Sequence, residues 1–150
     1  MKVTLLSKIE NCNFEELFKK KGYAFFTKGD YNLNIIGIRA KGRRITNSFN
    51  DYLVLIYNNG NKTGIKFVYS ITTDAGAPYM KKPINDAGCA VLVPGQYKGC
   101  YQLGLHNNKY KALVQRKPVK VYRDNNKDDV YDFEPKTIET GLFGINIHKA

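Results

Sequence analysis

The stretch "DYLVLIYNNGNKTGIKFVYSITT", residues 51 to 73, decides the fold class. Its two ends, residues 51–57 and 64–73, are rich in β-branched and aromatic residues, which favour strands. The polar middle contains Asn59-Gly60, a pair that accepts the positive φ angles of tight hairpin turns. The stretch therefore predicts two strands joined by a hairpin.

Similar runs continue on both sides, with turn residues between them. Their residues are 23–27, 31–39, 89–95, 101–106, 110–115, 119–123 and 141–148. One helix is predicted over residues 14 to 21, because Asn13 is a capping residue, Glu16 follows three positions later and Gly22 stands at the end. These patterns predict a mainly β fold, a β-sandwich with one short N-terminal helix, and a length of 150 residues predicts a single domain over residues 1 to 150.

The chain is strongly basic, with 24 Lys and Arg against 13 Asp and Glu, a net charge of +11. Such a field attracts polyanions, which include nucleic acid, anionic lipid and anionic cell-wall polymers. The apolar run before Ser7 is too short for a signal peptide, and no later stretch has the length of a membrane span. We therefore expect a soluble chain that is cytoplasmic as synthesised.

The cysteines do not form a recognisable motif. Cys12, Cys89 and Cys100 are odd in number and share no CxxC spacing, which indicates neither a disulfide framework nor a zinc site. Cys100 and His106 would lie on the same face of one strand but about 20 Å apart. The cysteines are expected to be reduced and structural.

Two groups of basic residues raise the alternative of nucleic-acid binding. They are "RAKGRR", with Arg39, Lys41, Arg43 and Arg44, and "KYKALVQRKPVKVYR" at residues 109–123. They could follow a phosphate backbone with tyrosines as stacking surfaces, or form an ordinary solvated surface. Because the charges are scattered and no nucleic-acid motif accompanies them, the sequence favours the second interpretation.

The segment "DNNKDDVYD" resembles the first part of a calcium loop, in which short oxygen ligands on alternate residues surround a hard cation. The predicted ligands are Asp124, Asn126, Asp128 and Asp132. The sixth position is Asp129 where a glycine is usual, and the twelfth is Pro135 where a bidentate glutamate is usual. A structural Ca²⁺ and an acidic turn without metal both fit these residues, and no cofactor is otherwise required.

The last predicted strand ends in a histidine. Alternation in "GLFGINIHKA" places Phe143, Ile145 and Ile147 on one side and Leu142, Gly144, Asn146 and His148 on the other. A neutral imidazole with a pKa of about 6.5 can accept a thiol proton. His148 is therefore a candidate general base, and a surface histidine is the simpler alternative.

Three segments together resemble the L,D-transpeptidase (YkuD-type) family, in a branch associated with phages and gut bacteria. They are "SITTDAG" (70–76), "DAGCAVLVPGQY" (86–97) and "GINIH" (144–148), and the resemblance covers residues 23 to 150. It implies a β-sandwich that acts on peptidoglycan, with a cysteine that attacks a stem-peptide carbonyl and passes the acyl group to an amine or to water.

The resemblance also implies roles for individual residues. His148 is the general base or orienting histidine, and His106, Tyr97, Gly144 and Asn146 belong to the substrate site. In the family, an S-x-G-C segment with the nucleophile follows the histidine strand, and these residues do not include it, so we expect the chain alone to be inactive. The alternatives are a non-catalytic domain that binds a wall polymer or a protein, and a nucleic-acid-binding β-domain.

Overall fold

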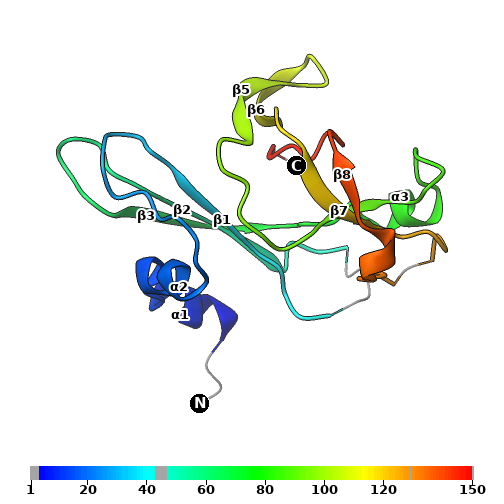
Figure 1. Cartoon of the computed structure of the whole chain (residues 1–150), viewed down its shortest axis with the longest axis horizontal. Helices are drawn as coiled ribbons and strands as arrows, with labels where there is room; N and C mark the ends of the chain where they lie inside the picture. The colour runs from blue at the N-terminus through cyan, green and yellow to red at the C-terminus, as the bar shows by residue number, and fades with distance from the viewer. Residues whose placement is uncertain (1–3, 43–46, 129, 150) are drawn as a thin grey trace. The chain divides into compact units, whose positions relative to one another are not determined.

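The computed structural model describes residues 4–42, 47–128 and 130–149 (Figure 1). The chain is mainly β, as the sequence predicts, with strands in three sheets and few helices. It divides into unit 1, Met1–Ala40 with Phe49–Thr72, and unit 2, Lys41–Ser48 with Thr73–Ala150. The prediction of a single domain stays a prediction, and Arg43, Arg44 and Asp129 lie outside the described residues.

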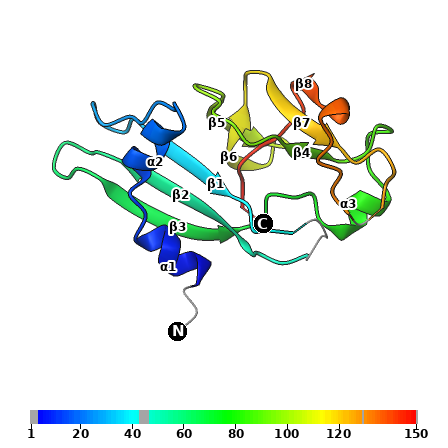
Figure 2. The same ribbon diagram turned by 60° about the horizontal axis from the view of Figure 1, so that its bottom comes forward.

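Unit 1 is an antiparallel sheet with two short helices. The sheet has the order β1-β2-β3. Its strands are β1 (Asn34–Ile38), β2 (Asp51–Tyr57) and β3 (Ile65–Ile71), and the helices are α1 (Leu5–Glu10) and α2 (Phe14–Lys20). Figure 2 shows both helices beside this sheet.

The predicted hairpin between β2 and β3 is present. The Asn59 side-chain oxygen accepts the Lys62 amide at 3.0 Å, and Gly60 has a φ of 75°. Gly60 takes the positive φ that the sequence predicts, whereas Asn59 does not, because the connection is the longer loop 58–64 rather than a tight two-residue turn. The core of unit 1 forms between this sheet and the helices, around Ile9, Phe14, Val54 and Ile56.

The helix predicted over residues 14 to 21 is α2, and the Asn13 side chain accepts the Glu16 amide at 3.2 Å as its cap. The prediction of one helix was wrong, because α1 precedes it and α3 follows in unit 2. Thr4 caps α1 by accepting the Ser7 amide at 3.1 Å. The Ile9 side chain of α1 is buried in the core, and Lys66 Nζ donates to the carbonyls of Ile9 and Glu10, both at 2.9 Å.

Residues 23–27 are not a strand, although their composition predicts one. The Asn34 side chain accepts the Phe26 amide at 2.8 Å and donates to the Phe26 carbonyl at 2.8 Å. The same amide nitrogen donates to the Ile56 carbonyl at 3.3 Å. A buried side-chain amide thus provides the hydrogen bonds that a neighbouring strand would otherwise supply.

Unit 2 contains the remaining elements. They are α3 (Ala77–Lys81), β4 (Ala90–Leu92), β5 (Tyr101–His106), β6 (Tyr110–Gln115), β7 (Val119–Arg123), the 3₁₀ turn η1 (Pro135–Thr137) and β8 (Glu139–Gly141). One sheet has the order β4-β7-β8, and β5 and β6 form a separate hairpin. Among the described helices, none has the length and apolar composition that crossing a bilayer requires.

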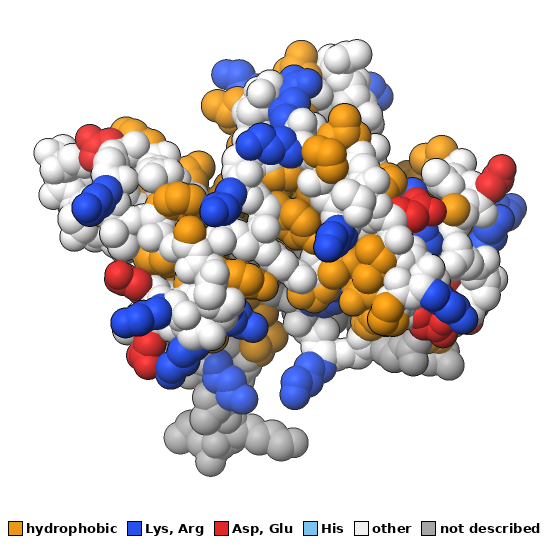
Figure 3. Space-filling model, viewed as in Figure 1, with side chains coloured by type: hydrophobic (Ala, Val, Ile, Leu, Met, Phe, Trp, Pro, Cys, Tyr) orange, Lys and Arg blue, Asp and Glu red, His pale blue; other side chains and the backbone are white. Residues whose placement is uncertain are grey.

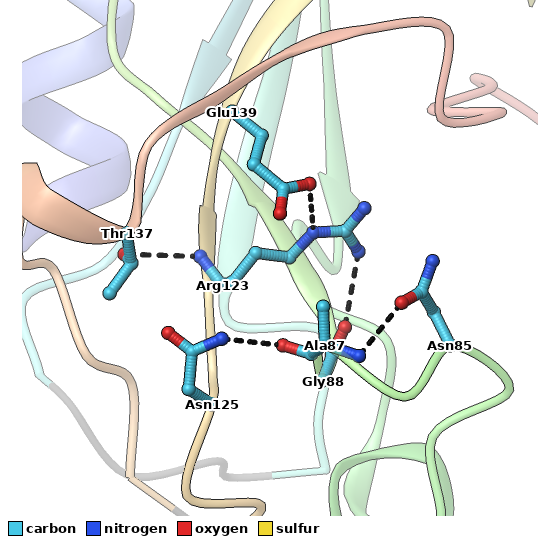
Figure 4. Close-up of polar contacts among 7 residues, drawn as sticks. All are labelled: Asn85, Ala87, Gly88, Arg123, Asn125, Thr137 and Glu139. Carbon is cyan, nitrogen blue, oxygen red and sulfur yellow. Dashed lines mark hydrogen bonds and ion pairs between the residues drawn. The ribbon is translucent and has the colours of Figure 1, made fainter.

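Arg123 contacts several segments of unit 2 (Figure 4). Its Nε lies 2.9 Å from a Glu139 carboxylate oxygen, and its guanidinium donates to the Gly88 carbonyl at 3.1 Å. The guanidinium also lies 4.8 Å from the centre of the Phe143 ring. Only 5% of Arg123 is exposed, so this desolvated cation is held by paired charge, a carbonyl and an aromatic face.

Candidate functional site

The chain's two histidines are in contact at the turn end of the β5-β6 hairpin, where His106 is the last residue of β5. The imidazoles of His106 and His148 are stacked, with ring centres 3.9 Å apart and planes inclined by 18°. Tyr110 lies beside both rings, at 5.5 Å from His106 and 6.1 Å from His148. The sequence singles out each histidine, but nothing in it indicates that the two are in contact.

Backbone pairing explains how the histidines come together. Leu113 of β6 and Ile147 exchange both backbone hydrogen bonds, at 3.0 and 2.9 Å, so Ile147 forms an isolated antiparallel β-bridge to the hairpin. Continuing this register places His148 opposite Ala112, which is itself opposite Gly104. Two small residues thus leave the space in which the His148 ring reaches His106.

The predicted strand over residues 141–148 is only partly formed. Gly144 has a φ of 68°, and its carbonyl accepts the Asn146 amide at 2.8 Å, so the chain turns there. Phe143 and Ile145 still pack into the core around Val121, while Asn146 and His148 reach the histidine site. The predicted separation into an apolar and a polar side therefore holds across the turn.

Gln115 replaces the missing strand pairing. Its side-chain oxygen accepts the amides of Phe143 and Ile145, both at 3.1 Å. Its side-chain nitrogen donates to the carbonyls of Lys117 at 2.8 Å and Gly141 at 2.9 Å. This one side chain therefore fixes the path of the segment that leads to Asn146 and His148.

Hydrogen bonding determines which nitrogen of His106 carries the proton. The Gln115 backbone amide donates to the Asn146 side-chain oxygen at 2.9 Å, so the Asn146 nitrogen is the atom that faces His106 Nδ1, at 3.2 Å. Nδ1 must then accept, and the proton of the neutral ring is on Nε2. The Asn107 side-chain nitrogen lies 3.1 Å from Nε2, so this tautomer requires the Asn107 amide to rotate until its oxygen accepts the Nε2 proton.

The same arrangement keeps His106 neutral. Desolvation lowers the pKa of His106 below its ordinary value of 6.5, and the neighbouring His148 lowers it further. Protonation would also place a hydrogen on Nδ1, where the Asn146 amide already points one. His106 is therefore a neutral partner for the second ring.

His148 is held in the opposite tautomer. Its Nδ1 lies 2.7 Å from the Lys149 carbonyl oxygen, which can only accept, so the ring proton is on Nδ1. The Tyr110 hydroxyl lies 3.0 Å from the same nitrogen. His148 Nε2 has no hydrogen-bond partner in the described part of the chain, and the side chain is exposed. A lone pair thus faces solvent on an oriented ring, as a general base requires.

The remaining residues predicted for the substrate site lie in different settings. Tyr97 packs against the cluster of Cys100, Val119 and Val121, and its hydroxyl donates to the Val93 carbonyl at 2.7 Å. Gly144 is exposed at the turn that positions Asn146. Of the predicted set, the structure brings together His148, His106 and Asn146.

The cysteines belong to the packing of the chain, as the sequence predicts. Cys89 is buried and its thiol donates to the Tyr79 carbonyl at 3.0 Å. Burial raises the pKa of Cys89, the charge of Asp124 raises it further, and Arg123 lowers it. A raised pKa is the reverse of what a nucleophilic thiol needs.

Cys100 is also buried, and its sulfur lies 3.4 Å from the Lys117 carbonyl. Cys12 packs on the core of unit 1. None of the three is among the hydrogen-bond or ring contacts of the two histidines within the described residues.

The predicted calcium loop uses two of its oxygens for local turns. Asn126 accepts the Asp128 amide at 3.2 Å, and Asp128 accepts the Val130 amide at 2.6 Å. Within the described residues, no three His, Cys, Asp or Glu side chains come together as a metal-binding group. The calcium site, with Asp132 as its fourth ligand, therefore stays a prediction.

Asp124 is the unusual member of this loop. Only 1% of it is exposed, and neither carboxylate oxygen has a hydrogen-bond partner among the described residues. Burial raises its pKa to about 6, the charges of Asp128 and Asp132 add to this rise, and the Lys127 backbone amide opposes it. A buried acid without a partner favours its protonated form.

Comparison with models of protein families, with curated proteins and with solved structures gave no match. The functional argument therefore depends on the geometry of the histidine site and on the residues of the sequence. Gln115, Tyr110 and Ala112 were not predicted as parts of the site, because a glutamine, a tyrosine and an alanine within a strand carry no local signal of such a role.

Proposed function

We propose that the chain is the histidine-bearing part of a peptidoglycan-active acyl-transfer domain, a β-sandwich of the L,D-transpeptidase type. The observation that carries the proposal is the free Nε2 of His148, on a ring whose Nδ1 proton is directed at the Lys149 carbonyl. The resemblance of residues 70–76, 86–97 and 144–148 to that family supplies the reaction.

In the proposed reaction, His148 Nε2 takes the proton of a cysteine thiol. The thiolate attacks the carbonyl carbon of a stem-peptide bond, and the imidazolium returns the proton to the departing amine. An amine or water then releases the acyl group from sulfur. The Lys149 carbonyl stabilises the imidazolium, because it accepts the Nδ1 proton in both charge states.

The neighbours of His148 fit this role. Neutral His106 lies against the ring without adding positive charge when His148 is protonated. The buried Cys89 and Cys100 are not suited as the nucleophile, so we propose that it comes from an S-x-G-C segment like that of the family. Lys and Arg side chains are spread over the surface seen in Figure 3, which favours an anionic wall polymer as partner.

The test uses purified muropeptides and the reading frame of the source, expressed together with any S-x-G-C segment that follows residue 150. Turnover is expected, with a loss of about a thousandfold in His148→Ala, because the thiol then lacks its base. His106→Gln is the matched control. It is expected to lower turnover about tenfold, because it removes a neighbour of the base rather than the base itself.

Residues 1 to 150 alone are expected to be nearly inactive on the same substrates. Turnover by the longer protein that does not change in His148→Ala would contradict the proposal. So would robust turnover by residues 1 to 150 that alkylation of Cys100 abolishes.

A further inference from the structure

The side of the unit 1 sheet that faces away from the core is apolar, where antiparallel sheets usually carry polar residues. Residues 36, 54, 56 and 68 pack into the core of this unit, so the alternate positions lie on the other side. Those positions include Ile35, Leu53, Leu55, Tyr57, Phe67 and Tyr69, and none of these six is buried. We call this surface the aromatic face.

Four aromatic rings form a row on this face. Tyr31 and Tyr57 have ring centres 5.7 Å apart with planes inclined by 26°. Phe67 follows at 6.4 Å and 20° from Tyr57, and Tyr69 follows at 6.3 Å and 19° from Phe67. Tyr31, Phe67 and Tyr69 are 66%, 44% and 48% exposed. The near-parallel rings thus form a continuous row that remains accessible.

The aromatic rings beside α2 in the same unit pack differently. Phe18 meets Tyr23 at 83° and Phe25 at 80°, which are edge-to-face contacts. Both this geometry and near-parallel stacking are favourable between aromatic rings. The parallel row on the aromatic face instead presents its rings side by side, which suits a ligand that extends along it.

The charge of the aromatic face indicates the kind of ligand. Within β1, β2 and β3, no Lys or Arg lies on this side, although the chain has a net charge of +11. Asp51 is the acidic residue on this side, and it is buried with its carboxylate accepting the Ala40 amide at 2.8 Å. A nucleic acid needs cations for its phosphates, so this face does not suit one.

The tyrosine hydroxyls argue against a purely apolar partner. Those of Tyr31, Tyr57 and Tyr69 make no hydrogen bond to another described residue. A second copy of the chain or an apolar protein surface would bury these hydroxyls. Burying a hydroxyl without a hydrogen-bond partner costs free energy. The face therefore suits a ligand with apolar ring surfaces and many hydroxyls.

We propose that the aromatic face binds the glycan strand of the cell wall through its N-acetylated pyranose rings, which carry no charge. The C–H faces of such sugars pack on aromatic rings, and their hydroxyls can bond to the tyrosines. The identity of the sugar rests on the proposed function, whereas the preference for an uncharged, hydroxyl-rich chain rests on the aromatic face alone.

The test measures binding of chitohexaose, a soluble hexamer of β-1,4-linked N-acetylglucosamine, by calorimetry and by NMR. Tyr31→Ala, which leaves the strands unchanged, and Tyr69→Thr, which keeps a strand-forming residue, are each expected to weaken binding about tenfold. Phe49→Ala is the matched control, because Phe49 is 56% exposed in the same unit and does not belong to the row. Equal melting temperatures would exclude unfolding as the cause.

His148→Ala is expected to keep chitohexaose binding unchanged, which separates this inference from the proposed reaction. The inference is overturned if the wild type does not bind the hexamer, or if Phe49→Ala weakens binding as much as Tyr69→Thr does. It is also overturned if poly(dT) binds in place of the hexamer, or if the protein dimerises through this face and Tyr31→Ala abolishes the dimer.

Discussion

Asp124→Asn is expected to make unit 2 more stable at neutral pH. The side chain is 1% exposed and its pKa is raised to about 6 by burial and by the charges of Asp128 and Asp132. The folded state therefore binds this proton more tightly than the unfolded chain, in which the pKa is near 3.8. The contribution of Asp124 to stability is therefore greatest below about pH 4 and is lost as the pH rises through about 6.

The size of the effect follows from the two pKa values. They differ by about 2, and each tenfold change in an acid dissociation constant corresponds to about 1.4 kcal/mol, which sets an upper limit of about 3 kcal/mol. An asparagine has nearly the shape of the protonated acid but adds a donor that needs a partner, which costs at least about 1 kcal/mol, so we expect a gain of about 1 to 2 kcal/mol above pH 6.5.

The assay is urea unfolding of the wild type and of Asp124→Asn between pH 4 and pH 8. The difference between the two free energies of unfolding should grow across this range and then level off. Asp86→Asn is the control, because Asp86 is an exposed aspartate in the same unit. A difference that stays constant with pH, or a wild type that is the more stable protein above pH 6.5, would refute the reasoning.

Four further substitutions and one titration test other parts of unit 2. Gln115→Ala should lower the free energy of unfolding, measured in urea, by about 2 to 4 kcal/mol, because it removes four side-chain hydrogen bonds. Gly88→Ala should lower the free energy of unfolding by at least about 3 kcal/mol, because its new Cβ would lie 1.7 Å from a backbone carbonyl oxygen. The Cβ of Gly144→Ala would meet no atom within 4 Å, so this substitution should cost only about 1 kcal/mol of backbone strain. By NMR, His106 should titrate below pH 6.5, and His148→Ala should move it back toward 6.5, because the neighbouring charge is gone.

Calcium provides a separate test of the acidic loop. If Asp124, Asn126, Asp128 and Asp132 bind Ca²⁺, then millimolar calcium should raise the melting temperature of the wild type, and Asp128→Ala should remove that rise. An equal response of the two proteins would leave an acidic turn without a metal.

The sequence predicted the strands and α2 well where the signal is local. The runs at 51–57 and 64–73 contain their β-branched residues and their turn within a few positions of one another, and β2 and β3 form there. The capping residue of α2 is likewise adjacent to the helix that it starts. Such signals need no knowledge of the rest of the chain.

The predictions failed where a distant side chain competes for the backbone. Composition alone predicts strands at 23–27 and 141–148, but Asn34 and Gln115 bind the backbone of these segments instead. Both are polar residues at positions where a strand pattern gives no reason to expect a structural role. The contact of His106 with His148 was missed for the same reason, since 42 positions of sequence separate two rings that one backbone bridge brings together.

The two tautomers of the histidine pair follow from these same backbone contacts. Gln115 donates its backbone amide to Asn146, which turns the Asn146 nitrogen toward His106 and makes His106 Nδ1 an acceptor. The bridge at Ile147 then sets the position of the next residue, His148, whose Nδ1 donates to the Lys149 carbonyl. If the amide of Asn146 were replaced by an isosteric leucine, His106 would lose the donor that holds Nδ1 unprotonated. His148 would then stack on a ring that is easier to charge, and the pair would no longer contain a ring whose hydrogen bonds favour its neutral form.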